Sequence, residues 1–590
     1  MGGVPGAGDA GDAAGGRTAR TAATAAEGPE AAPADGASAD AVRVGVLPAD
    51  ALQTGAVPAD AVRREAVAAD ARSSVSSRAH GANGAAAGGR PSGRRDRHGL
   101  EMSGLGSGAA GDAAATWYES AVESLLFFRG DVAESVAELR RLAPGAPLGQ
   151  VFAAYLGLLG TEQSQAAAAR QEFARFRAAA DDGARTAREQ AHLTAAAAWL
   201  DGNIARAGAV LREIAVAWPR DALALVVGHQ IDFFTGNAAA LRDRIAGALT
   251  AWDEEDPHHG PLLGMLGFGL EESGHYARAE ETARAAVERH PGDVWGIHAV
   301  VHTLEMQGRF AEGIRFLDAR RPEWGAGNMM AVHNWWHYAL YALEAGDTRR
   351  VLEVYDAALD PAVTSGLALE LLDASSLLWR FHLGGDDDRA AVGDRWAPLA
   401  DAWAARGDGP HYAFNDTHAV MAYLGAGRVR EAEALLADRE EWATHPHPGV
   451  TNHAMTAEIG LPVCRALLAF TQERYEDAVD LLFPLRGRFA TFGGSHAQRD
   501  AVQRTLLEAA LRARRLDLAR TLLSERLALR PTSPYNWLGQ ARLADAVGRS
   551  ALAATARERA AALAAPGRSS TQDVGPATAE GAVPGGEVAR

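Results

Sequence analysis

The sequence predicts an all-α fold built of stacked helical hairpins, with low-complexity segments at both ends. Three observations support this prediction. Leucine and aromatic residues recur at helical spacing from about Trp117 to Ala564. One stretch in the middle of the chain has the residue pattern of a repeating two-helix unit. The segments outside the helical region are rich in Ala and Gly and poor in large apolar side chains, so they cannot bury enough surface to offset chain entropy.

The repeating unit is clearest in GPLLGMLGFGLEESGHYARAEETARAAVERHP, which begins at Gly260. Counted from that residue, positions 4, 7, 8, 11, 15, 17, 20, 27 and 32 are Leu263, Leu266, Gly267, Leu270, Gly274, Tyr276, Ala279, Ala286 and Pro291. This is the pattern of the tetratricopeptide repeat, a helical hairpin of about 34 residues. Small residues at positions 8 and 20 let the two helices approach, and the glycine at position 15 permits the turn.

The same pattern recurs along the chain, and more loosely toward its C-terminus. Gly202 to Pro219 and Gly308 to Leu317 repeat the turn and the second helix. GAGRVREAEALL, QERYEDAVDLL, RARRLDLARTLL and AVGRSALAATA each read as a turn followed by a second helix. Because each hairpin buries its apolar face only against its neighbours, we expect a right-handed superhelical solenoid with a concave groove.

We therefore divide the chain into three parts. Residues 1–111 are expected to be a disordered, low-complexity Ala/Gly-rich segment, residues 112–565 a tetratricopeptide-like repeat domain, and residues 566–590 a disordered tail. Removal of residues 1–101 is accordingly expected to leave the fold intact. Within the repeat, position 5 should face the groove, so Gly264→Ala should be tolerated better than Gly267→Leu at the helix contact.

Charge and cysteine content limit the partners. The formal net charge is −17 and the pI is about 5.6, so the chain lacks the basic excess that phosphate neutralisation requires, and we expect no nucleic-acid partner. The single cysteine, Cys464, excludes an intrachain disulfide framework and fits a reducing compartment. We find no uninterrupted apolar run of about 18 residues and no signal-peptide pattern, so the sequence predicts a cytoplasmic protein without a membrane partner.

One stripe of polar residues lies on a predicted groove-facing helix. In HAVVHTLEMQG, residues His298, His302 and Glu305 have the i, i+4, i+7 spacing of one helix face. HNWWH places His333 and His337 at i and i+4 on the first helix of the next unit. Since consecutive units stack, we expect the two pairs to line the same cavity.

Three interpretations of this cluster remain open. The histidines could bind a partner or pack against neighbouring helices, they could perform metal-free acid/base chemistry with Glu305, or they could hold a divalent metal ion. The metalloprotease motif H-E-x-x-H is absent, because Glu305 follows the pair. The candidate catalytic residues are His298, His302, Glu305, His333 and His337, and the same four histidines are the candidate metal ligands.

Other polar residues on predicted helix faces are candidates for ligand binding. They are His192, Glu271, Asn334, Trp336, Arg380, Asn415, Asp416, His418, Ser495, Arg499 and Asp500. Gly493, Gly494 and Ser495 open a helix and could offer backbone N–H groups to an anion, but an ordinary serine N-cap explains them equally well.

Several of these stretches together resemble the tetratricopeptide repeat protein 38 family, in its bacterial members. The resemblance rests on TAREQAHLTAAAAWLDGN, the stretch from FGLEESGHYARAEE to HAVVHTLEMQGR, HNWWHYALYALEAGD, DASSLLWR, FNDTHAVMAY and GGSHAQRD, and it covers residues 112–565. It implies an α-helical repeat fold and no particular reaction or ligand.

The sequence thus leads to two hypotheses about function. The first is a cytoplasmic tetratricopeptide repeat protein that binds a peptide, a protein or a small molecule in its concave groove. The alternative is a hydrolase or acid/base enzyme that uses the His/Glu cluster, with or without a divalent metal.

Overall fold

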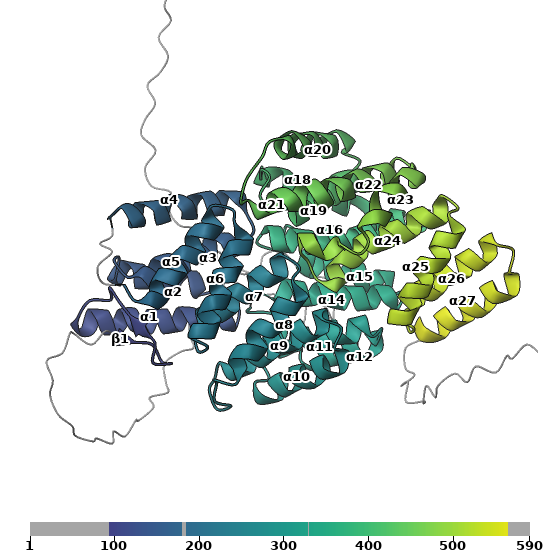
Figure 1. Cartoon of the computed structure of the whole chain (residues 1–590). Coiled ribbons are helices and arrows are strands. Elements are labelled where there is room, and N and C mark those ends of the chain that lie inside the picture. The colour runs from purple at the N-terminus through teal and green to yellow at the C-terminus, as the bar shows by residue number, and fades with distance from the viewer. Residues whose placement is uncertain (1–93, 180–184, 329, 565–590) are drawn as a thin grey trace, which may run out of the picture. The chain divides into compact units, whose positions relative to one another are not determined.

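The structure is a computed structural model that describes residues 94–179, 185–328 and 330–564, all within one compact unit. Helices adjacent in sequence pack against each other as hairpins, and each hairpin packs against the next (Figure 1). Apart from one two-stranded sheet, the regular structure in these ranges is helical. The predicted all-α solenoid of tetratricopeptide type is confirmed.

The N-terminal elements are β1 (Arg94–Arg95), β2 (Glu101–Met102), α1 (Gly108–Leu126), α2 (Val132–Leu142), α3 (Pro147–Leu159), α4 (Gln163–Ala179), α5 (Ala187–Leu200), α6 (Ile204–Ala217), α7 (Ala222–Phe234) and α8 (Ala238–Leu249). The central elements are α9 (His259–Glu272), α10 (Tyr276–Arg289), α11 (Val294–Met306), α12 (Phe310–Ala319), α13 (Arg321–Trp324), α14 (Ala331–Glu344), α15 (Thr348–Val354), the π-helix η3 (Tyr355–Leu359), α16 (Ala368–His382), α17 (Asp386–Val392), the 3₁₀ turn η4 (Gly393–Arg395), α18 (Trp396–Arg406) and α19 (Ala413–Gly425). The C-terminal elements are α20 (Val429–Thr444), α21 (Thr451–Met455), the π-helix η5 (Thr456–Gly460), α22 (Leu461–Thr471), α23 (Tyr475–Leu482), the 3₁₀ turns η6 (Phe483–Leu485) and η7 (Phe489–Phe492), α24 (His496–Arg512), α25 (Leu516–Leu529), α26 (Pro534–Ala546) and α27 (Ser550–Ala564).

The hairpin α9–α10 follows the register that the sequence predicts. Gly274 has a φ of +78° between the two helices, a left-handed conformation that glycine adopts without a steric cost. A Cβ on Gly267 would lie 3.0 Å from the Cβ of Ala283 on α10, so this glycine does mark the close approach of the paired helices. In two later hairpins, Glu473 and Arg514 occupy the corresponding left-handed position, which explains why those units look irregular in sequence.

The expectation that Gly264 faces the groove is wrong. A Cβ at this position would lie 2.4 Å from the backbone nitrogen of Gly296 on α11. Position 5 of this unit therefore lies against the first helix of the next unit instead of facing an open groove. The space available for even one methyl group is smaller at Gly264 than at Gly267.

The expected boundary at residue 111 also needs correction. The segment from Arg94 to Met102 forms the antiparallel pair β1–β2, and Met102 and Leu105 are buried. Arg188 on α5 donates to the backbone carbonyl of Glu101 and pairs with Asp96. A truncation at residue 101 would remove these contacts. Residues 108–111, also expected to be disordered, begin helix α1, whereas residues 1–93 and the expected tail at 566–590 lie outside the described residues.

The concave side of the central hairpins is not an open groove, because helix α24 packs against it. This 17-residue helix contacts α11, α16, α22 and α23, and most of its residues are buried. Trp379 on α16 donates its indole N–H to Thr505, and Arg380 donates to the carbonyl of Ala497. The first helices of the central units consequently present their polar faces to α24 and to one another.

One helical run meets the length and composition test for a membrane span. Thr451–Thr471 covers α21, η5 and α22, with a mean hydropathy of 1.3, and 67% of its apolar window is buried within the fold. A core helix of a globular protein passes the same test. The packing of α22 against α19, α23 and α24 accounts for its apolar composition.

Candidate functional site

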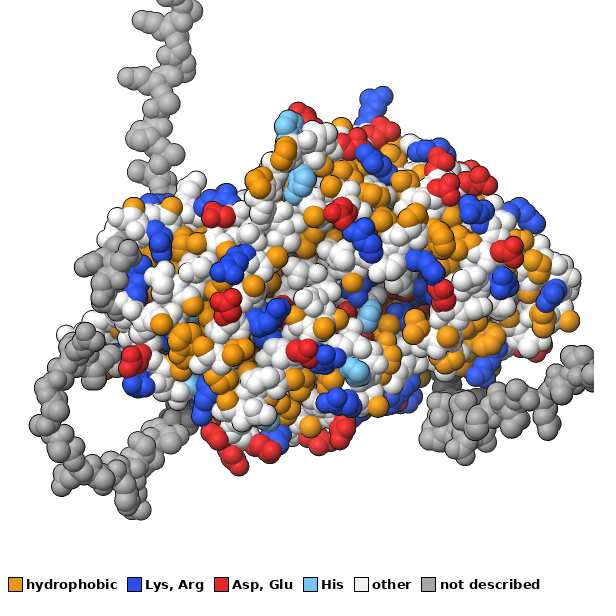
Figure 2. Space-filling model, viewed as in Figure 1, with side chains coloured by type: hydrophobic (Ala, Val, Ile, Leu, Met, Phe, Trp, Pro, Cys, Tyr) orange, Lys and Arg blue, Asp and Glu red, His pale blue; other side chains and the backbone are white. Residues whose placement is uncertain are grey.

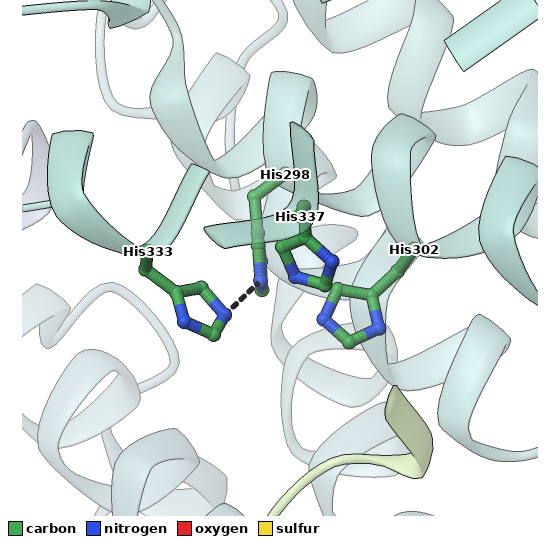
Figure 3. A group of neighbouring side chains, drawn as sticks. All are labelled: His298, His302, His333 and His337. Carbon is green, nitrogen blue, oxygen red and sulfur yellow. Dashed lines mark hydrogen bonds between the residues drawn. The ribbon is translucent and has the colours of Figure 1, made fainter. Parts of the chain in front are cut away.

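Four histidines from two neighbouring helices converge inside the central hairpins. His298 and His302 lie on α11, and His333 and His337 lie on α14 (Figure 3). The ring centroids of His298 and His302 are 4.4 Å apart, as are those of His302 and His337, and no pair in the group is further apart than 6.4 Å. One ring nitrogen of each residue lies within 4.8 Å of the others. The two i, i+4 pairs therefore come together in one cluster, as their spacing predicts.

The cluster is enclosed rather than open to a groove. His302 and His337 have no exposed surface, and His298 is 3% exposed. Only His333 is partly accessible, with 19% of its side chain exposed. The α11 helix that carries the first pair begins at Asp293, whose carboxylate accepts from the backbone N–H groups of Trp295 and Gly296.

Three of the four imidazoles face a carboxylate through Nδ1. His333 Nδ1 lies 2.6 Å from Oδ2 of Asp373 on α16, and His337 Nδ1 lies 2.8 Å from Oε2 of Glu305 on α11. His302 Nδ1 lies 3.4 Å from Oε2 of Glu271 on α9. A carboxylate at Nδ1 fixes the ring proton there and leaves the lone pair on Nε2.

The remaining ring nitrogens are poorly satisfied. Nε2 of His333 and Nε2 of His298 face each other at 3.1 Å. Nε2 of His337, Nδ1 of His298 and both nitrogens of His302 are buried without a hydrogen-bond partner among the described residues. Since more than nine tenths of buried polar groups in proteins are hydrogen-bonded, such a concentration of unpartnered nitrogens calls for an explanation.

Burial sets the protonation of the site. It lowers the pKa values of His298 and His337, and the neighbouring imidazoles add to this effect. Burial also raises the pKa of Glu305. Burial alone would raise the pKa of Glu271, but the neighbouring imidazoles of His302 and His496 lower it to about 2. His298 and His337 are thus favoured as neutral imidazoles, which can donate lone pairs, and Glu271 is favoured as an ionised carboxylate.

A second layer of polar side chains surrounds the cluster. The ring of Trp336 stacks on that of His333, with the ring centroids 5.2 Å apart. The guanidinium of Arg380 lies over the ring of Trp336, 5.7 Å from its centroid. Asn334 is fully buried on α14, and neither atom of its amide has a partner among the described residues. Asp500 on α24 pairs with Arg504 at 2.6 Å and with Arg526 at 2.8 Å.

An open pocket adjoins this layer. It has a volume of about 380 Å³ and is lined by Glu272, Ser273, Gly274, Tyr276, Met306, His496, Gln503, Arg526, Leu529 and Arg530. His496, the first residue of α24, has 27% of its side chain exposed, and its Nδ1 lies 3.3 Å from Oε1 of Glu271. Glu271 in turn faces His302. A chain of three side chains therefore connects the pocket to the histidine cluster.

The other predicted ligand-binding residues divide into two groups. Glu271, Trp336, Arg380, Arg499 and Asp500 belong to the central polar layer, and Ser495 is an N-cap that accepts from the backbone N–H of Gln498 in a capping box. The ordinary N-cap explanation of Ser495 therefore holds in the structure.

The second group bonds elsewhere in the fold. His192 pairs with Asp221, Asn415 donates to the carbonyl of Thr161, and Asp416 pairs with Arg439. His418 Nδ1 lies 2.8 Å from the carbonyl oxygen of Phe414 on its own helix. Among the described ranges, no hydrogen bond or ion pair joins these four residues to the histidine cluster.

Sequence reasoning did not place several residues of the pocket. Arg526 lies on α25 and Arg530 directly follows this helix, and both reach the site because α24 and α25 return to the central hairpins. His98, Asp256 and His258 also cluster, and His98 was assigned to the low-complexity segment. The repeat pattern and the helical spacing describe turns and helix faces within one hairpin, and they do not predict such long-range contacts.

Another pocket of about 370 Å³ lies between α6, α7 and the α21–η5 segment. Its wall includes Arg212, Asp232, Thr451, Glu458 and Arg488, and Glu458 and Arg488 pair with each other. Asp232 is held by Arg244 at 2.7 Å. Its charged groups are therefore paired within the fold.

Comparison with solved structures finds distant matches that include tetratricopeptide repeat proteins. No protein-family model matches the chain. Among solved structures, the human IFIT1 dimer with m7Gppp-AAAA is 13% identical and covers 78% of this chain and 96% of its own, with a TM-score of 0.35. A tetratricopeptide repeat protein from Parabacteroides merdae is 13% identical and covers 48% of this chain and 97% of its own, with a TM-score of 0.26. Yeast Tom70 is 12% identical and covers 76% and 88%, with a TM-score of 0.27. These scores are too low to support an argument about ligands, and the fold assignment rests on the helical hairpins themselves.

Proposed function

We propose that the protein is a cytoplasmic tetratricopeptide-type protein, related to the tetratricopeptide repeat protein 38 family, that binds a ligand in the pocket between α9 and α25. The supporting observation is a pocket of about 380 Å³ whose lining includes the charged side chains of Arg526, Arg530 and Glu272. The family proposal rests on the sequence resemblance, and the cytoplasmic proposal on the single, buried cysteine.

The size of the pocket restricts the ligand. Because α24 covers the concave faces of the central hairpins, an extended peptide has no continuous groove there. A small molecule, or the end of a peptide or protein chain, fits a volume at the low end of the range of ligand sites.

The charges favour an anionic group. Arg526 and Arg530 line the pocket and share the carboxylate of Asp500 with Arg504, so three guanidinium groups face one carboxylate. Nη2 of Arg526 is buried without a partner among the described residues. Glu272, the acid on the opposite wall, is already paired with Arg499 at 2.9 Å. A carboxylate-bearing ligand would satisfy the arginines bidentately.

On the face shown in Figure 2, acidic and basic side chains are interspersed over the described helices. A partner with an extended phosphate backbone would need a continuous basic field. This distribution supports a small or peptide ligand and gives no support to a nucleic-acid partner.

Thermal melts with defined probes test the proposal. We expect citrate, or short peptides with a free C-terminal carboxylate, to raise the melting temperature, and the matching C-terminal amides to raise it less. Arg530→Gln should abolish the difference between acid and amide. Arg520→Gln is the matched control, because Arg520 lies on the same helix with an exposed side chain. Equal responses to acids and amides in the unsubstituted protein would contradict the proposal.

A second candidate function is acid/base or hydrolytic chemistry, favoured by the chain His496–Glu271–His302 that leads from the pocket to the cluster. Nearby Glu272 and Glu271 raise the pKa of His496 despite its burial, so this residue can hold a proton at the pocket wall. Turnover of small esters or amides that bind in the pocket should then be lost in His496→Gln. Unchanged turnover in that variant would remove this candidate.

A further inference from the structure

We propose that His298, His302, His333 and His337 together bind one divalent first-row transition-metal ion inside the fold. The proposal concerns the enclosed cluster and is independent of ligand binding in the pocket. Its starting point is the hydrogen-bond inventory of the four rings. A neutral imidazole offers one donor and one acceptor, and a buried ring normally finds a partner for each.

Hydrogen bonds within the protein do not satisfy these rings. His337 uses Nδ1 toward Glu305, and its Nε2 then has no partner. His302 has no hydrogen bond at either nitrogen, although Glu271 lies 3.4 Å from its Nδ1. A buried, unpartnered nitrogen loses its interaction with water and gains nothing in return. A metal ion at the centre of the cluster would supply a partner to Nε2 of His302 and Nε2 of His337, and it would replace the contact between the facing Nε2 atoms of His298 and His333.

The carboxylates are placed as in known metal sites. A histidine that binds a metal through one ring nitrogen usually donates the other N–H to a carboxylate, a carbonyl or water, which orients the ring and increases its basicity. Asp373, Glu305 and Glu271 each face Nδ1 of a different histidine. Helices α16, α11 and α9 thus supply one carboxylate each to the same cluster, and ionised carboxylates there would offset the charge of a dication.

His298 supplies the fourth ligand in a different way. Its Nε2 lies 3.1 Å from Nε2 of His333, whose Nδ1 faces Asp373. Without an ion, one of these two facing nitrogens must carry a proton. With an ion between the helices, both lone pairs point at it, and this close pair becomes two adjacent ligands.

The spacing suits a four-coordinate ion. Metal–nitrogen bonds of about 2.0–2.1 Å in a tetrahedron place the nitrogens about 3.4 Å apart. The four nitrogens lie within 4.8 Å of one another, and Nε2 of His298 and Nε2 of His333 are 3.1 Å apart, so these two values bracket the tetrahedral spacing. Four imidazoles suit zinc, copper, nickel or iron better than magnesium or calcium, which prefer oxygen ligands.

The other two groups of potential metal ligands in the described residues each lie beside an arginine. In the His98 group, Nε2 of His98 bonds Nδ1 of His258, and Arg97 lies 3.4 Å from Nε2 of His258, so a cation would be repelled there. In the Glu271–Glu272–His496 group, Glu272 is paired with Arg499. The nearest guanidinium to the four-histidine cluster, Arg380, donates to the carbonyls of Ser376 and Ala497.

The test is the metal content of the full-length protein, purified without a histidine tag and analysed for manganese, iron, cobalt, nickel, copper and zinc. We expect one equivalent of one of these metals. Removal by a chelator should lower the melting temperature, and zinc(II) added to the stripped protein should restore it. X-ray absorption of the bound ion should show four nitrogen ligands at about 2.0–2.1 Å, with imidazole scattering beyond them.

Variants locate the ion. His298→Gln and His337→Gln should each lose it, whereas His418→Gln, a buried histidine of α19 outside the cluster, should keep it. Asp373→Asn should keep the ion but bind it about 10–100-fold more weakly. Arg530→Gln, which alters the pocket, should keep it fully, so failure of the metal proposal and failure of ligand binding are distinguishable.

Two results would overturn the proposal. One is metal-free protein that takes up no zinc(II) in equilibrium dialysis. The other is a bound metal that persists in folded His298→Gln and His337→Gln variants. If those variants fail to fold, cobalt(II) loading of the unsubstituted protein decides the question, because a four-imidazole site gives an absorption spectrum and X-ray scattering that a site of oxygen ligands does not.

Discussion

Two buried polar clusters in this protein differ in the hydrogen-bond partners of their histidine ring nitrogens. His192 on α5 has a partner at each ring nitrogen: Nε2 lies 2.9 Å from Asp221, and Nδ1 lies 3.2 Å from the hydroxyl of Tyr155. In the cluster of α11 and α14, buried nitrogens of His298, His302 and His337 lack partners. Both clusters are buried between helices, so burial alone does not distinguish them.

The difference teaches how to distinguish a structural histidine from a functional candidate. In the first cluster, Arg188 and His192 both pair with Asp221, and the other oxygen of Asp221 caps α7 through the N–H of Ala224. Burial alone would raise the pKa of Asp221, but the charges of His192 and Arg188 hold it well below its ordinary value. That cluster stabilises the fold by itself. The second cluster is complete only when something else occupies its centre.

The largest effect that we expect is acid destabilisation of the whole fold. Burial lowers the pKa of His229 to about 3 and that of His418 to about 4, and it also lowers the pKa values of His298 and His337. These groups bind fewer protons in the folded state than in the unfolded chain, so the unfolding free energy should fall as the pH drops from about 6.5 toward about 4.

Asp293 acts in the opposite direction. Burial raises its pKa to about 7, so its contribution to stability is present at low pH and is lost as the pH rises from about 4 to about 7. Glu305, whose pKa burial also raises, acts in the same direction as Asp293, and we expect these acids not to outweigh the four histidines. Thermal melts at about pH 7.5, 6 and 5 would measure the balance, and a melting temperature that stays constant or rises toward pH 5 would contradict the expectation.

The second-largest effect that we expect follows the loss of Asp221, which should lower the stability of the fold through the cluster around His192. Asp221→Ala leaves Arg188 buried without its main partner, removes the partner of His192 and removes the cap of α7. Removing one partner of a buried ion pair typically costs about 3–5 kcal/mol. Denaturant unfolding would measure it. Asp243→Ala is a suitable control, because Asp243 is an exposed acid of the adjacent helix α8, and it should change stability little.

A substitution that disturbs packing next to the four-histidine cluster should have a smaller effect on stability. Gly264→Ala places a methyl group 2.4 Å from the backbone of Gly296 at the start of the histidine helix, where the neighbour cannot rotate away. Gly267→Ala meets the Cβ of Ala283 at 3.0 Å, a contact that a small shift of α10 can relieve. Overpacking costs about 1–3 kcal/mol, and we expect Gly264→Ala to lie at the upper end and to exceed Gly267→Ala. Chemical denaturation of both variants would rank them.

The two glycines also show what sequence could and could not predict. The contact between Gly267 and α10 is local to one hairpin, and the repeat pattern specifies it. The face shared by His298 and His302 follows from helical periodicity in the same way. Gly264 contacts the next unit, and His496 reaches Glu271 across 225 residues, so both depend on how the units stack and on where α24 returns. No periodic signal records such contacts.

The smallest effect that we expect comes from replacing one histidine by leucine in each cluster, which compares the two clusters directly. His192→Leu removes a ring whose two nitrogens are bonded, and it leaves buried Tyr155 and Asp221 each with one partner fewer. His302→Leu removes a ring whose nitrogens have no hydrogen bonds, and leucine fills a comparable volume.

In chelator-treated protein, His302→Leu should change the unfolding free energy by less than about 1 kcal/mol, because an apolar group of similar shape replaces a polar group that had no partner. His192→Leu should cost more, about 1–3 kcal/mol for the polar groups left unsatisfied. In protein loaded with zinc(II), the order should reverse, since only His302→Leu then loses the stabilisation that a bound ion gives. Paired melts of the two variants with and without the ion measure both orders. If His192→Leu were the less harmful change in the stripped protein, the hydrogen bonds of its ring would not be what distinguishes the two clusters.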